Sequence, residues 1–124
     1  MDHYQEITRY LDNAREILST KANKEGQVYK DIKYVQMASG TAYSAALMIA
    51  DEYLRKKEGA RFAKLNSIDE YRIRLNKYNK TLMAYLNKAY DMLHLAGYYH
   101  GTPSVGTIKQ GMDAAQKMLA LIEH

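Results

Sequence analysis

The sequence contains no cysteine and no tryptophan, and it has a single proline among 124 residues. Without cysteine the chain cannot form disulfides, bind zinc through thiolates or use a cysteine nucleophile. No stretch approaches the roughly 18 consecutive apolar residues of a membrane-spanning helix, so we expect no membrane segment. The start of the chain, Met1 to Glu6, has neither a basic region nor an apolar run and does not resemble a signal peptide. We therefore expect a cytoplasmic protein.

Helix-breaking residues are also scarce, which favours long helices. Hydrophobic residues make up 47% of the chain and include all twelve tyrosines. This content supplies enough burial to offset the entropy of the chain, so disorder is not expected. A chain of 124 residues has the length of one domain, and we expect residues 1–124 to form a single one.

Apolar residues recur at three- and four-residue steps in four segments, and no strand pattern competes with them. This periodicity predicts an all-α, up-and-down four-helix bundle. The predicted helices cover about residues 2–22, 28–57, 68–100 and 103–122.

Residues typical of helix ends support these boundaries. Asp2 with Gln5 resembles a capping box, and Ser67 with Glu70 forms one. Gly59 suits the end of the second helix, and the link over residues 58–66 has room for a short extra helix. The fourth helix is expected to start with Thr102 as its cap and the proline at its first position.

The third segment carries a strict seven-residue repeat over five cycles. One register holds Ile68, Leu75, Leu82, Ala89 and Ala96, and the other holds Tyr71, Tyr78, Tyr85, Met92 and Tyr99. A sustained period of 3.5 residues predicts one continuous helix, from Ile68 to about His100, that packs almost parallel to a neighbour.

The net charge of +4 is unevenly distributed. Residues 55–80 hold nine Lys or Arg and three Asp or Glu, whereas residues 1–54 hold six and eight. We expect this basic block to gather at one end of the bundle, near both chain termini. It indicates either a surface for nucleic acid or another polyanion, or, as is usual for charge runs, a solvated helix end. The candidate polyanion-binding residues are Arg55, Lys56, Lys57, Arg61, Lys64, Arg72 and Arg74.

From Leu82 onward the third segment is apolar on more than one face, so one neighbouring helix cannot cover it. The surplus indicates additional core, a subunit interface or a pocket, and we favour core packing together with a dimer contact. The candidate interface or pocket residues are Tyr85, Tyr90, Leu93, His94 and Tyr98.

No motif predicts catalysis, a cofactor or a metal. The patch around Ser44 lacks the G-x-S-x-G pattern, and the chain has no glycine-rich phosphate loop. Asp91 and His94 form one D-x-x-H step, whereas di-iron bundles place E-x-x-H on two helices and add a Glu from each of two others. We therefore expect no cofactor, no metal and no catalytic residue.

Two stretches, YKDIKYVQMASGTAYSAAL (residues 29–47) and AYDMLHLAGYYHG (residues 89–101), precede a last helix that ends in AQKMLALI. In their order and in their pattern of small, aromatic and apolar residues they resemble HEPN (higher eukaryote and prokaryote nucleotide-binding) helical domains and a small uncharacterised bacterial family of similar bundles. The resemblance implies a four- or five-helix bundle that is frequently dimeric. Ribonuclease members carry Arg-x4–6-His, and no arginine here is followed by histidine at that spacing, so the nuclease activity is not implied.

These observations predict a non-enzymatic helical bundle that acts through protein contacts as a homodimer. The alternative is an RNA-binding or RNA-processing HEPN-type protein, such as a toxin–antitoxin component, that uses the basic block.

Overall fold

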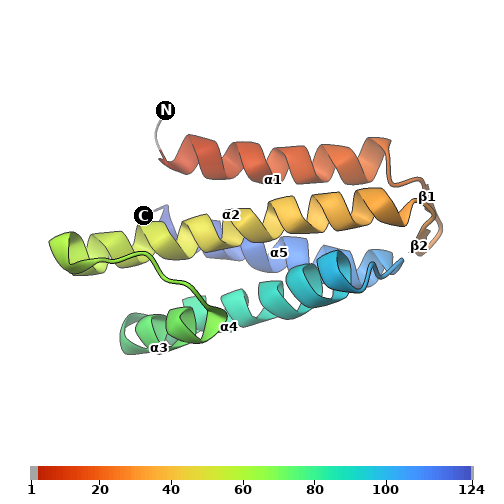
Figure 1. Cartoon of the computed structure of the whole chain (residues 1–124). Coiled ribbons are helices and arrows are strands. Elements are labelled where there is room, and N and C mark those ends of the chain that lie inside the picture. The colour runs from red at the N-terminus through yellow and green to blue at the C-terminus, as the bar shows by residue number, and fades with distance from the viewer. Residues whose placement is uncertain (1–2, 124) are drawn as a thin grey trace.

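The computed structural model describes residues 3–123, which form an all-α bundle, as the sequence predicts. Its rods run alternately up and down: α1 (His3–Thr20), α2 (Ile32–Glu58), a helical run from Ile68 to Tyr99, and α5 (Val105–Ile122) (Figure 1). α1 and the third rod lie on opposite sides of α2, and α5 lies behind it. No helix in this part of the chain is both long and apolar enough to cross a membrane.

The buried residues follow the helical periodicity of the sequence. α1 buries Ile7, Leu11, Ala14 and Leu18, which lie at steps of four, three and four. α5 buries its whole predicted stripe, from Ile108 to Ile122. α2 is central and contacts every other helix. It can do so because its buried side is built largely from small residues, including Ala38, Ala42, Ala45 and Ala46.

A small hairpin joins α1 to α2, so the expectation of no strand and of a helix from Val28 is wrong. β1 (Lys24–Glu25) pairs antiparallel with β2 (Val28–Tyr29), and Gly26 turns the chain with a φ of 64°. The Tyr29 N–H donates to the Pro103 carbonyl at 2.8 Å, and the Val105 N–H donates to the Gln27 carbonyl at 3.0 Å. These long-range backbone bonds hold the hairpin against the start of α5, and they outweigh the helical pattern of the local sequence.

The third rod is interrupted, so the prediction of one continuous helix is also wrong. α3 (Ile68–Tyr78) and α4 (Lys80–Ala89) meet at Asn79, whose backbone is extended, with φ −156° and ψ 94°. The Asn79 N–H closes α3 by donating to the Leu75 carbonyl at 2.8 Å, and its side chain accepts from the Leu82 N–H at 2.9 Å. One asparagine thus ends one helix and caps the next.

The rod then continues as a π-helical segment, η2 (Tyr90–Tyr99). At its end the His100 N–H donates to the carbonyl of Leu95, five residues back, at 3.0 Å. From Leu75 to Ala89 the first heptad register stays fully buried across the break, whereas two tyrosines of the second register are exposed. Leu75 and Leu82 of the first register are fully buried, whereas Tyr78 and Tyr99 of the second are 39% and 65% exposed.

Two of the expected helix ends are present, at Ser67 and Gly59. The Ser67 hydroxyl accepts from the Glu70 N–H at 3.2 Å, which confirms this capping residue. Gly59, with a φ of 57°, ends α2 and begins the short helix η1 (Gly59–Arg61) in the predicted link. The cap of α5 is Ser104 rather than Thr102, since the Ser104 hydroxyl accepts from the Thr107 N–H at 3.1 Å. The capping box expected at Asp2 lies outside the described residues.

Candidate binding groove along α2

Two hollows lie along the side of α2 that no other described helix covers. Their volumes are about 450 and 510 Å³. Both are lined by Tyr43, Ser44 and Leu47 of α2 and by His94 of η2, so they are two parts of one open groove. We call this the α2 groove. It lies between α1, which contributes Tyr10, and the third rod.

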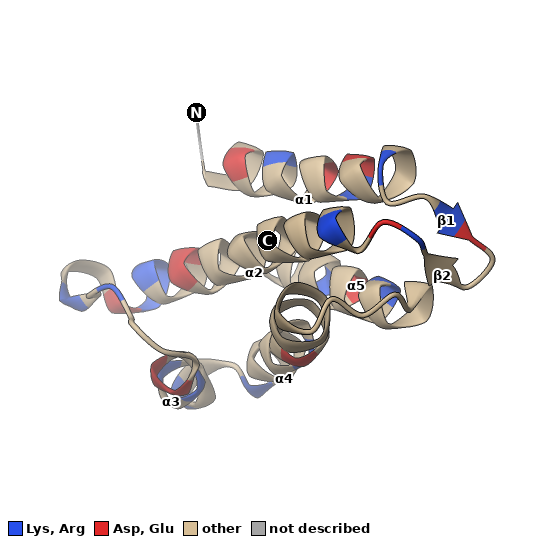
Figure 2. Cartoon of the chain, turned by 45° about the vertical axis from the view of Figure 1, so that its right-hand side comes forward, with Lys and Arg blue, Asp and Glu red and all other residues tan. Residues whose placement is uncertain are grey.

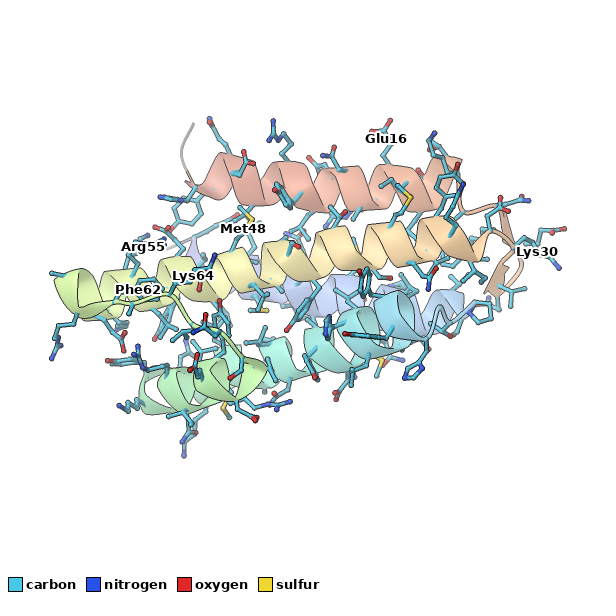
Figure 3. All side chains as sticks on the ribbon, in the orientation of Figure 1. Glu16, Lys30, Met48, Arg55, Phe62 and Lys64 are labelled. Atoms are coloured by element: carbon cyan, nitrogen blue, oxygen red, sulfur yellow. The ribbon has the colours of Figure 1, made fainter. Side chains whose placement is uncertain are left out.

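The floor of the α2 groove is a second seam of α2. Met37, Thr41, Ser44, Met48 and Asp51 line it and follow one another at steps of four, three, four and three. This 3.5-residue spacing is the pattern of a helix face that packs against a neighbour. Met37 is nevertheless 50% exposed, and Ser44 is exposed as well. Figure 3 shows Met48 on this uncovered side of α2.

One wall of the groove is aromatic and comes from η2. Tyr90, His94 and Tyr98 lie at steps of four on the side of the π-helical segment that faces α2. The His94 ring stacks on Tyr43 with 4.7 Å between centroids, and it lies 5.2 Å from Tyr90 and 6.1 Å from Tyr98. Burial lowers the pKa of His94 below its usual value of 6.5.

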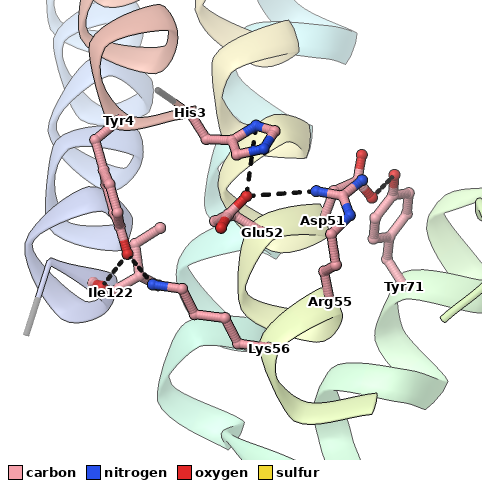
Figure 4. A network of polar contacts seen from close by, with 8 residues as sticks. All are labelled: His3, Tyr4, Asp51, Glu52, Arg55, Lys56, Tyr71 and Ile122. Atoms are coloured by element: carbon pink, nitrogen blue, oxygen red, sulfur yellow. Dashed lines mark hydrogen bonds and ion pairs between the residues drawn. The ribbon is translucent and has the colours of Figure 1, made fainter. Parts of the chain in front are cut away.

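The far end of the groove, beside α3, is polar. The Tyr71 hydroxyl donates to Asp51 Oδ1 at 2.7 Å (Figure 4), and Lys64 and Asn66 of the link line the same hollow. Burial raises the pKa of the Asp51 carboxyl, and burial together with Asp51 raises that of Tyr71. Burial raises the pKa of Tyr43 to about 12. Both phenols are therefore protonated near neutral pH and can donate hydrogen bonds.

The structure separates the residues predicted for an interface or pocket. Tyr90, His94 and Tyr98 line the α2 groove. Leu93 is fully buried and packs against Gly111 in the core, so it offers no accessible surface. Tyr85 is not among the lining residues, and its ring lies 5.7 Å from Lys117 Nζ of α5.

The predicted basic block lies at the end of the bundle near the described ends of the chain, with acidic residues between its cations (Figure 2). Three of its four arginines pair inside the chain: Arg55 with Glu52 at 3.4 Å, Arg72 with Asp69 at 3.0 Å, and Arg74 with Glu58 at 2.6 Å.

The other cations of the block differ in their surroundings. Lys56 contacts the Tyr4 hydroxyl (Figure 4), and Lys57 Nζ lies 5.7 Å from the centroid of the Tyr53 ring. Arg61 is exposed on η1, whereas Lys64 faces the α2 groove (Figure 3). Three of the four arginines of the block are thus paired with carboxylates, and acidic residues interrupt its positive charge.

Sequence reasoning missed the floor of the groove, above all Met37, Met48 and Asp51. Its signal was present, because the floor residues follow one another along α2 at the 3.5-residue spacing of a packing face. Among residues 3–123, no cluster of three or more His, Asp or Glu side chains is placed to hold a metal ion.

The comparisons with known proteins agree with this architecture. A solved structure described as a protein of unknown function from Dyadobacter fermentans superposes with a TM-score of 0.85 and 32% sequence identity, covering 98% of this chain and 92% of that one. A comparison with curated proteins finds no match. The model of the family described as "Domain of unknown function (DUF5618)" matches residues 2–124. The chain therefore belongs to the DUF5618 family.

Proposed function

We propose that this protein acts through protein contacts, as a homodimer in which two copies meet along their α2 grooves. The observation that carries the proposal is the second seam of α2, which has the spacing of a helix–helix interface but no helix packed over it within residues 3–123. A seam of this kind exposes apolar surface to water until a partner covers it.

The centre of the seam suits a second α2 helix. Thr41 and Ser44 have small side chains, so another helix can approach closely at this point. A two-fold axis through this region would place the same residues of both copies opposite each other, as a symmetric dimer requires. Larger apolar side chains, Met37 on one side and Leu47 with Met48 on the other, would then enclose the contact.

The aromatic wall supplies anchors for such an interface. Tyr98 is 49% exposed, and Tyr99 beside it is 65% exposed. Tyrosines are enriched among the residues that dominate binding energies, because they bury a large apolar ring and keep one hydroxyl for a hydrogen bond. The wall is pre-organised by the ring contacts of His94, so little side-chain freedom remains to be lost on association.

The test is the substitution Ser44→Glu, which places a charge at the centre of the groove. Ser44 is exposed, so the variant should fold as the wild type does, which circular dichroism checks. We expect sedimentation velocity to show a dimer for the wild type and a monomer for Ser44→Glu. The matched control is Thr81→Glu, on the exposed side of α4 and outside the groove, which should remain dimeric. A wild type that stays monomeric at high concentration would overturn the proposal, as would a dimeric Ser44→Glu.

We also propose that the chain is related to HEPN domains. The order of the two stretches that resemble those domains supports this relation, and so does the helical bundle that they form. A site of action in the cytoplasm is supported by the absence of cysteine, which suits a reducing compartment. RNA binding by the basic block has less support than dimerisation, because Arg55, Arg72 and Arg74 already have carboxylate partners.

A further inference from the structure

A separate cavity lies at the other end of the bundle, where the hairpin meets α1 and α5. Its volume is about 430 Å³, within the usual range of small-molecule sites. The β1–β2 hairpin stands at the end of the molecule opposite to the described ends of the chain (Figure 1), and the cavity shares no lining residue with the α2 groove.

The floor of the cavity is apolar. Leu18, Tyr29, Val105 and Met112 line it and are each at most 9% exposed, and Ile108 beneath them is fully buried. These side chains come from α1, β2 and α5. The hairpin is fixed to α5 by the hydrogen bonds of Tyr29 and Val105, so the floor is held in place before any ligand arrives.

The rim of the cavity is cationic. Arg15 of α1, Lys24 of β1 and Lys109 of α5 line it, and its described lining residues include no Asp or Glu. Arg15 is held by Asp12 and by Gln116, which fixes its direction. The pair between Lys109 and Asp113, at 3.2 Å, is exposed on both sides and therefore weak. Lys24 forms no ion pair within residues 3–123.

We infer that this cavity binds a small amphipathic carboxylate, with its apolar chain on the floor and its carboxylate at the Lys24 side of the rim. An apolar floor alone would accept any hydrocarbon, and surface cations alone would attract any anion. The combination selects a molecule with both properties, because the chain gains by leaving water while the charged head stays at the wet rim beside a cation.

Binding of decanoate to the full chain labelled with ¹⁵N tests this inference. We expect decanoate to shift the amide signals of Lys24, Tyr29 and Ile108 in a saturable way. Decanol, which has the same chain without the charge, and acetate, which has the charge without the chain, should each bind at least tenfold more weakly.

The matched variants are Lys24→Glu, at the rim, and Lys21→Glu, three residues earlier and outside the cavity. Both residues are exposed and both changes alter the net charge equally, so they separate a specific contact from general attraction. We expect at least tenfold weaker decanoate binding for Lys24→Glu and wild-type binding for Lys21→Glu. Equal effects of the two variants, decanol binding as well as decanoate, or no saturable shift at the cavity would each overturn the inference.

Discussion

Gly111 lies where α5 crosses the third rod, and alanine at this position should destabilise the protein. A Cβ there would lie 2.5 Å from Cγ and 2.6 Å from Cδ2 of Leu93, and 3.1 Å from Cβ of Met92. Leu93 is fully buried and cannot swing into solvent. Overpacking of a core costs about 1–3 kcal/mol, whereas glycine to alanine inside a helix gains about 1 kcal/mol. We expect the free energy of unfolding to fall by up to about 2 kcal/mol on balance.

Gly106 provides a control in the same helix. A Cβ there would meet nothing closer than the Ser104 hydroxyl, at 3.9 Å, so Gly106→Ala should gain up to about 1 kcal/mol. Urea unfolding followed by circular dichroism measures both variants. In a Leu93→Ala background the clash is absent, and Gly111→Ala should no longer destabilise. The reasoning fails if Gly111→Ala alone is as stable as the wild type while Gly106→Ala shows its gain.

Two further predictions concern His94 and Asn79. The pKa of His94 is lowered in the folded protein, so the unfolded chain binds this proton more readily, and stability should fall as the pH drops below about 6.5. His94→Gln should lose this part of the pH dependence in urea unfolding; an unchanged dependence would contradict it. Asn79→Ala removes the cap of α4 and should lower the free energy of unfolding by about 1 kcal/mol, with Asn76→Ala, an exposed site within α3, as the control. Equal losses in the two asparagine variants would rule out a capping role.

The periodic part of the fold was predictable, because local spacing determines which side of a helix is apolar. The stripes of α1 and α5 and the cap at Ser67 follow from sequence steps alone. The hairpin was not predictable in this way. Its strands have two residues each, and they depend on hydrogen bonds to Pro103 and Val105, more than seventy positions away. No window around Val28 contains that information.

The interruption of the third rod shows a different limit. Its heptad continues without a fault through Asn79, so periodicity predicts one helix. The Asn79 side chain nevertheless accepts a hydrogen bond from the backbone of the next turn. This bond offsets the loss of helical hydrogen bonds where the backbone is extended. No pattern in the sequence indicates the π-helical segment either. The sequence grouped Tyr90, His94 and Tyr98, which line the α2 groove, with Leu93, which the structure buries.

The small residues of α2 link the fold to the proposed interface. On the inner side, Ser39 faces Gly97 of η2 so closely that a Cβ at position 97 would collide with it, and the Ser39 hydroxyl is buried without a hydrogen-bond partner among the described residues. An unpaired buried hydroxyl costs about 1–3 kcal/mol of folding free energy, so the close packing of Ser39 against Gly97 persists despite this cost. Its consequence is that η2 stands near enough to α2 for Tyr98 to contact Gly40 on the outer side. Short side chains on both sides of α2 thus allow η2 to pack closely on the inner side and leave the outer seam shallow and lined by aromatic rings. A larger residue at position 39 or 97 would move the aromatic wall as well as the core.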